Sequence, residues 1–197
     1  YFYVSGSHSA KRSTCASNPN SRHVLRFKRD PATGRALYLP GGADLVDYAD
    51  TGRLWAALQT EPAFAALAPH AGERACLGAA SGQQGINIEG MAVLDGRLYF
   101  GLRGPVLQGA AQVLAVDADA LFSGGDLQAT RTALALGQRG IRDMVAVPGG
   151  MLLLAGPDDG ASHQGMGWGI WWWDGKTSTA VVTPKLLAEL DLRHVQT

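Results

Sequence analysis

Three short stretches of this chain hold the residues that could do chemistry. Residues 5–12 place serine hydroxyls, an imidazole and two cations side by side. Residues 87–90 contain a glutamate, and residues 140–143 contain an arginine followed by an aspartate. Side chains of these types can recognise an anion, or they can act as general acids and bases. Either activity requires the fold to bring the stretches together.

The segment 5–12 favours binding over catalysis. His8 stands between two serines, but neighbours on an extended chain point in opposite directions and cannot share a proton. The sequence also has no Gly-x-Ser-x-Gly nucleophile elbow. We therefore expect a cluster of hydroxyl, imidazole and cation that binds an anion at a loop of exposed backbone N–H groups, with ordinary loop hydrogen bonding as the alternative. The ligand-binding candidates here are Ser7, Lys11 and Arg12.

A repeated pattern indicates which elements position these residues. Residues 88–117 and 141–174 follow one order: an apolar strand, a tight turn, a second strand running into Gly-Pro, a loop and a third strand. The copies are offset by 53 residues at their starts, as in four-stranded propeller blades with loop insertions. Residues 1–4 and 23–27 fit two strands of a third copy. The sequence predicts an all-β fold, a β-propeller fragment of about three four-stranded blades with a small helical insertion.

We expect a single partial propeller domain over the whole chain. Its parts are an incomplete blade at 1–42, a helical insertion at 43–80, blades at 86–137 and 139–184, and the start of the next segment at 185–197. A closed ring needs about four to eight blades, so the remainder of the propeller should be missing from this chain. Apolar residues near helical spacing in the insertion predict two short helices that cover the rim or bind a partner. They are Leu54, Trp55, Leu58, Phe64 and Leu67.

One face of the predicted propeller should carry the function. In a meandering blade, the loop entering the first strand and the loop between the second and third strands share a face. Here those loops are long and polar, whereas the turns 95–96 and 148–150 on the other face are minimal. Repeat scaffolds usually place function where the loops are elaborated. Further ligand-binding candidates on this face are Asn87, Arg103, Arg139 and Arg142.

Glu89 and Arg142 occupy equivalent places in the two full copies, where each innermost strand begins. Opposite charges near a channel mouth must be paired if they are buried, so one interpretation is a structural ion-pair network between blades. The other is a ligand-binding or catalytic site. The candidate bases or ligands for a divalent metal cofactor are Glu89, Asp143 and His8, although no metal-ligand spacing defines a site. Asp158 and Asp159 are weaker Ca²⁺ candidates, because no Asp-x-Asp-x-Asp-Gly loop is present.

Composition excludes several classes of partner. The formal net charge is zero, so no global field attracts nucleic acid or an acidic membrane. No apolar run approaches the ~18 residues of a spanning helix.

Cys15 and Cys76 stand in unlike contexts, which indicates neither a disulfide framework nor a zinc site. The tryptophans at 171–173 alternate faces of a strand and should pack between blades, with an aromatic binding platform as the alternative. The compartment, cytoplasmic or exported, stays open.

Five motifs in order give the chain a family resemblance. They are Gly6-Ser7-His8-Ser9 with Lys11-Arg12, Asn87-Ile88-Glu89-Gly90-Met91-Ala92, Gly101-Leu102-Arg103-Gly104-Pro105, Arg139-Gly140-Ile141-Arg142-Asp143-Met144 and Ala155-Gly156-Pro157. Together they resemble the bacterial family called domain of unknown function 3616. The resemblance implies a β-propeller of uncharacterised function and supplies no catalytic residues. A more distant similarity links the Glu-Gly strand starts to esterase-like phytases.

Two classes of function follow as hypotheses. The first is a non-catalytic module that binds a small anionic ligand or an acidic partner through Lys11, Arg12, Arg103, Arg139 and Arg142. The second is a phosphoesterase or esterase on the same face, with the arginines stabilising developing negative charge. Binding is favoured because arginine is plentiful, whereas no nucleophile is defined. An interaction scaffold is the third alternative. We expect His8, Glu89, Arg103, Arg142 and Asp143 to converge on one face.

Overall fold

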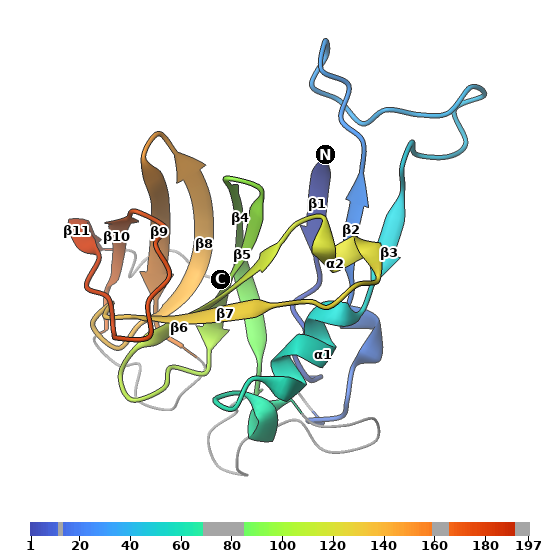
Figure 1. Cartoon of the computed structure of the whole chain (residues 1–197). Coiled ribbons are helices and arrows are strands. Elements are labelled where there is room, and N and C mark those ends of the chain that lie inside the picture. Colours follow the sequence, from blue (N-terminus) through green and yellow to red (C-terminus); the bar gives the residue numbers. More distant parts are fainter. Residues whose placement is uncertain (12–13, 69–84, 159–165, 192–197) are drawn as a thin grey trace.

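The computed structural model of this chain describes residues 1–11, 14–68, 85–158 and 166–191. These residues form three antiparallel sheets of three, four and four strands, together with short helices. In Figure 1 the sheets stand in a row, from the first in blue, through the second in green and yellow, to the third in orange and red. The all-β class predicted from the sequence is confirmed.

The first sheet has the strand order β1-β2-β3. Its strands are β1 (Phe2–Ser5), β2 (Val24–Phe27) and β3 (Ala49–Thr51). Between β2 and β3 the chain forms a ribbon over residues 28–46, held by the Lys28 N–H to Val46 carbonyl bond of 2.8 Å. Within this ribbon, Ala36 and Tyr38 make only isolated bridges, and Pro40 lies in its turn. Figure 1 shows this ribbon projecting beyond the sheet.

One sequence expectation for this region differs from the structure. The segment 43–80 is not wholly a helical insertion, since β3 lies within it. The expected boundary missed β3 because only three residues pair there.

The second sheet has the order β4-β5-β6-β7. Its strands are β4 (Asn87–Leu94), β5 (Arg97–Gly104), β6 (Ala111–Asp117) and β7 (Ala129–Leu134). The turn between β4 and β5 consists of Asp95 and Gly96, with φ values of 49° and 74°. Two positive φ angles are what a two-residue hairpin turn of type I′ requires, so Asp-Gly fixes this connection.

The third sheet has the order β11-β10-β9-β8. Its strands are β8 (Gly140–Val147), β9 (Gly150–Gly156), β10 (Trp168–Trp173) and β11 (Lys185–Leu190). Residues 185–190 therefore complete this sheet, and the prediction that they start the next segment is wrong. The chain near Val182 first bridges Leu134 of β7 in the second sheet, so the fourth strand of the third sheet begins only at Lys185. The predicted blade boundary at residue 184 is wrong for this reason.

The helices lie in the chain segments that connect the strands. They are η1 (Pro19–Ser21), α1 (Arg53–Thr60), η2 (Ala65–Leu67) and α2 (Ala120–Ser123). The predicted pair of short helices is thus present as α1 and η2. Leu54 and Leu58 are fully buried one turn apart on α1, and they pack with Phe64, Phe100 and Leu114 in one core cluster. This core joins the helical segment to the second sheet.

A second core lies between the second and third sheets. Tyr99 of β5 contacts the Trp173 ring edge-on at 5.8 Å between centroids, and Met144 and Ile141 of β8 lie in the same cluster. The sheets approach closely at Gly90, where a Cβ atom would lie 2.7 Å from Cγ of Met144 and 2.8 Å from Cγ2 of Ile141. Glycine is therefore required here for β4 to pack against β8.

Candidate functional site

The first strands of the second and third sheets carry β-bulges at matching places. The register of β4 on β5 shifts between Ile88 and Gly90, and that of β8 on β9 shifts between Ile141 and Asp143. The extra residue is Glu89 in β4 and Arg142 in β8. A bulge leaves one residue outside the ladder and redirects its side chain. The two sheets therefore each present one charged side chain near their junction.

The Glu89 carboxylate binds two arginines. Its Oε1 lies 2.8 Å from Nη1 of Arg103, and its Oε2 lies 3.0 Å from Nη1 of Arg142. The side chains are 29%, 17% and 14% exposed, respectively. Arg142 also donates through Nε to the carbonyl of Pro157 and stacks over Trp168 at 4.8 Å. The Glu89 carboxylate thus pairs with both guanidinium groups and links the two sheets.

Two further residues proposed near β4 and β8, Asp143 and Arg139, have partners other than Glu89. Asp143 is exposed, and its Oδ1 accepts a 2.8 Å bond from the N–H of Met144. Asn87 is buried at the start of β4. Arg139 instead forms an ion pair with Glu189 of β11 at 2.9 Å and donates to the carbonyl of Gly167. Two separate arginine clusters therefore replace the single predicted one.

The N-terminal segment lies next to β4. The carbonyl of Ser7 accepts a 2.7 Å hydrogen bond from the N–H of Ile88, and the hydroxyls of Ser7 and Ser9 lie 2.8 Å apart. Lys11 is exposed, and Arg12 lies outside the described residues. Ser7 thus comes within one residue of Glu89 through the backbone, but its hydroxyl bonds to a neighbouring serine.

His8 is fully buried and neutral. It has 1% exposure and a left-handed φ of 58°, and its Nδ1 lies 2.8 Å from the carbonyl oxygen of Gly6. A carbonyl can only accept, so Nδ1 carries the hydrogen and Nε2 presents a lone pair. Burial, helped by the positive charge of Arg22, lowers the pKa of His8 from 6.5 to about 4. Nε2 is buried with no hydrogen-bond partner.

Arg22 and Trp55 complete a cluster around His8. The guanidinium of Arg22 lies 3.8 Å from the centre of the Trp55 ring, and the His8 ring stacks on Trp55 with centroids 6.1 Å apart. Arg22 is 6% exposed, and its Nε and Nη2 are buried without hydrogen-bond partners, as is Nε1 of Trp55. Burial lowers the pKa of Arg22, and no described carboxylate forms an ion pair with it. The Arg22–Trp55–His8 cluster therefore combines unsatisfied donors with one unsatisfied acceptor.

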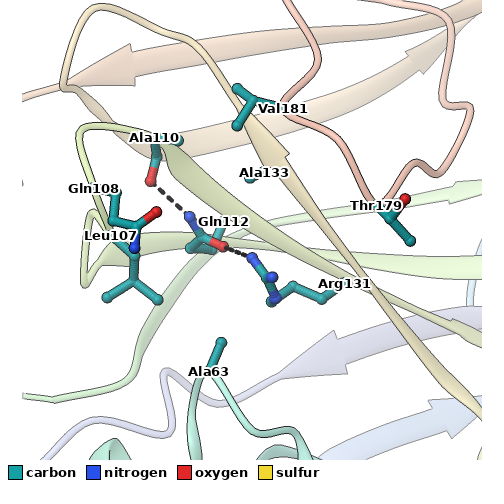
Figure 2. Close-up of a pocket in the computed structure, with 9 residues that line it drawn as sticks. All are labelled: Ala63, Leu107, Gln108, Ala110, Gln112, Arg131, Ala133, Thr179 and Val181. Carbon is teal, nitrogen blue, oxygen red and sulfur yellow. Dashed lines mark hydrogen bonds between the residues drawn. The ribbon is translucent and has the colours of Figure 1, made fainter.

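A pocket of about 430 Å³ opens beside the second sheet. Figure 2 shows the loop of Leu107 on one side, β7 with Arg131 across from it, and Thr179 and Ala63 from distant chain segments. Gln112, which is 1% exposed, donates through Nε2 to the carbonyl of Ala110 at 2.7 Å. Its Oε1 accepts a 2.8 Å bond from Nη1 of Arg131. The pocket therefore has a fixed polar wall and several apolar walls.

Sequence reasoning named His8 as a candidate but missed its neighbours Arg22 and Trp55, and it also missed the residues of the pocket. Trp55 was assigned only to an apolar helical stripe, and Arg22 was not singled out. A signal was available at Gln112, a polar residue at the start of the apolar run 111–116 that must find partners if buried. Arg131 gave no comparable signal because it lies among the threonines of an ordinary strand.

The described residues also bear on the remaining candidates for metal, disulfide and membrane interaction. Within the described ranges, no group of three or more His, Cys, Asp or Glu side chains is placed to hold a metal ion, and Asp159 lies outside those ranges. Cys15 is disulfide-bonded, although its sequence context indicated no disulfide framework; Cys76 lies outside the described residues. The spacing could not reveal the bond because pairing depends on tertiary structure. No described helix is long and apolar enough to cross a membrane.

Comparison with known proteins agrees with the family resemblance noted in the sequence, and the matched region contains four of the five motifs. The family described as protein of unknown function (DUF3616) matches residues 42–180. No curated protein and no solved structure matches the chain. The match covers more than half of the sequence and includes both bulged strands, β4 and β8. The chain therefore belongs to the family described as protein of unknown function (DUF3616).

Proposed function

We propose that this chain is a module that binds a small anionic ligand or the acidic group of a partner. Its sheets serve as blades of a β-propeller, and the ligand lies at the Arg22–Trp55–His8 cluster. The observation that carries the proposal is the guanidinium of Arg22, which is buried against Trp55 and has no carboxylate beside it among the described residues.

The energetics of Arg22 favour an anion. An unpaired cation in a protein interior costs several kcal/mol, and each buried N–H without an acceptor costs about 1–3 kcal/mol. Nε and Nη2 form one edge of the guanidinium, and two such parallel donors match two oxygens of a carboxylate or phosphate. A bound oxyanion would satisfy both N–H groups and the charge together.

The neighbours of Arg22 extend this recognition. Nε1 of Trp55 is a third buried donor, whereas Nε2 of neutral His8 is an acceptor. A group that both accepts and donates, such as hydrogen phosphate or a hydroxy acid, can bond to both kinds of atom. Lys11 is exposed in the same N-terminal segment and adds a positive charge that attracts anions from solution.

The propeller arrangement is supported by the connectivity of the sheets. Each four-stranded sheet is a meander of consecutive strands, and their first strands, β4 and β8, pack together at Gly90. The bond between Ser7 and Ile88 joins the N-terminal segment to the beginning of β4, which in a propeller would lie on the face with the long loops. The arginines first proposed for binding, Arg103, Arg139 and Arg142, already have carboxylate partners. Arg22 is therefore the preferred anchor for an anion.

Calorimetric titration with inorganic phosphate and with citrate tests the proposal. We expect Arg22→Gln to weaken binding of the better probe at least tenfold, because a buried charge-assisted pair contributes about 1.5–3 kcal/mol. Arg35 is exposed, so Arg35→Gln is the matched control and should leave the affinity unchanged. Failure of the wild-type protein to bind either probe, or equal binding by Arg22→Gln, would refute the proposal.

The same preparations distinguish the hydrolase alternative. Incubation with p-nitrophenyl phosphate and p-nitrophenyl acetate should give no turnover above a buffer blank. Turnover that Glu89→Gln or Asp143→Asn abolishes without lowering the melting temperature would establish a hydrolase instead. An interaction scaffold would show no probe binding and little response to any single loop substitution.

A further inference from the structure

The pocket in Figure 2 is a second candidate for a ligand site. Its volume of about 430 Å³ falls in the range of about 300–1,000 Å³ typical of small-molecule sites. Four separate chain segments line it: the stretch after α1, the loop before β6, strand β7 and the loop between β10 and β11. Such a pocket combines apolar walls with a few convergent polar groups.

Arg131 is held rigidly at this pocket. Its Nη1 bonds to Oε1 of Gln112 at 2.8 Å, and its Nε lies 3.3 Å from Oε1 of Glu61. Gln112 is itself anchored by Ala110, so the guanidinium is fixed from two sides. Nη2 of Arg131 forms no hydrogen bond within the described residues. It remains available as a preorganised donor, and little side-chain entropy would be lost on binding.

The charge of the pocket discriminates between ligands. The Arg131–Glu61 pair is neutral overall, with side chains 32% and 21% exposed. A carboxylate ligand would compete with Glu61 for Arg131 and leave a net negative charge in a partly buried place, which is unfavourable. A carbonyl oxygen accepts from Nη2 without that penalty. Leu107, Ala133 and Val181 give the remainder of the pocket an aliphatic lining.

We propose that this pocket binds a small uncharged molecule with a carbonyl group, such as a primary amide, attached to an aliphatic chain. The carbonyl accepts a hydrogen bond from Arg131, and the chain lies against Leu107, Ala133 and Val181. This ligand class and this pocket are distinct from the anion and the Arg22–Trp55–His8 cluster of the proposed function. The two inferences therefore stand or fall separately.

The test compares hexanamide with hexanoate, which have the same shape but different charge. Protein-observed NMR titration of the isotopically labelled chain should give saturable shifts at Arg131 and Ala133 with hexanamide. Hexanoate should bind there at least tenfold more weakly. Equal affinity of the two probes, or no saturable shift with hexanamide, would overturn the proposal.

Two valine variants provide the blocking test and its control. Val181 is 60% exposed at the pocket, so Val181→Trp should fill the pocket from a loop and weaken hexanamide binding at least tenfold without unfolding the protein. Val145 is 54% exposed on β8, away from the pocket lining, and Val145→Trp should change nothing. Unaltered hexanamide binding by folded Val181→Trp would place the ligand elsewhere. Phosphate titration of the same variants, which should be unaffected, separates this result from failure of the anion site.

Discussion

The carboxylate of Glu89 lies 3.0 Å from the guanidinium of Arg142, and each residue is the bulged residue of the first strand of its sheet. A bulge at the matching place in each strand therefore presents an acidic side chain from β4 and a basic side chain from β8. Both side chains lie where the two strands pack together. Arg103 shares the carboxylate from within the second sheet. Both arginines lie within hydrogen-bond distance of the Glu89 carboxylate, so the three side chains can hold the second and third sheets together.

Replacement of Glu89 should destabilise the fold. Glu89→Gln leaves Arg103 and Arg142 close together without a shared anion, and their side chains are only 17% and 14% exposed. We expect a loss of about 1–3 kcal/mol in the free energy of unfolding, between the values for exposed and buried pairs. Urea denaturation measures it. Glu189→Gln, which removes a carboxylate that is 53% exposed, should cost less than about 1 kcal/mol. Equal losses in the two variants would contradict the network's role.

Gly90 should resist enlargement even to alanine. The added Cβ would lie 2.7 Å from Cγ of Met144 and 2.8 Å from the stiff Cγ2 branch of Ile141, so β4 and β8 must separate. Overpacking of this kind costs about 1–3 kcal/mol, which thermal or urea unfolding of Gly90→Ala would detect. Gly125 has open space around its Cβ position, and Gly125→Ala should be neutral or slightly stabilising. A Gly90→Ala protein as stable as Gly125→Ala would show that the sheets are not closely packed.

Local sequence signals account for the strands but not for the cluster at Arg22. Alternating apolar residues and the turn Asp95-Gly96 predict β4 and β5, because period-two patterning and positive-φ turn residues act over short distances. The meeting of residues 8, 22 and 55 depends on how α1 packs against the N-terminal segment, which no local pattern encodes. Trp55 fits the apolar stripe of a helix whether its ring packs against a leucine or against a guanidinium, so the helical pattern does not identify its partner. The repeat predicted that Glu89 and Arg142 occupy equivalent positions, but it did not predict that both positions are β-bulges.

Protonation of His8 should make stability depend on pH. Its pKa falls from 6.5 to about 4 on folding, so between these values the unfolded chain binds a proton that the folded chain does not. Stability is therefore full above about pH 6.5 and falls as the pH is lowered, by up to about 3 kcal/mol at pH 4. The groups that influence His8 are the Gly6 carbonyl, Arg22 and His23.

Urea midpoints between pH 7.5 and pH 5 measure the effect of His8, in a range where most carboxylates stay ionised. His8→Leu should flatten the slope of stability against pH, even if the loss of the Gly6 bond lowers stability at every pH. His23 is half exposed beside Asp50, so His23→Gln should retain most of the slope. An unchanged slope in His8→Leu would mean that another group titrates.

Removal of the Arg22 charge should stabilise the ligand-free protein. Methionine keeps an apolar contact with Trp55 but has no N–H group to leave unsatisfied, so Arg22→Met should gain about 1–3 kcal/mol in the absence of anions. In the wild type, phosphate at about one hundred times its Kd should add about 2.7 kcal/mol, and Arg22→Met should not respond.

Arg97 is the matched control for the Arg22 substitution. It also lies over an aromatic ring, Tyr99, but it donates to the carbonyl of Ala115 and to the hydroxyl of Thr130. Arg97→Met should therefore lose stability rather than gain it, because two acceptors lose their donor. Thermal unfolding of both variants, with and without phosphate, gives the comparison. If Arg22→Met is destabilised as much as Arg97→Met in phosphate-free buffer, then Arg22 is already satisfied in the folded protein, and its role as the anchor of an anion is lost.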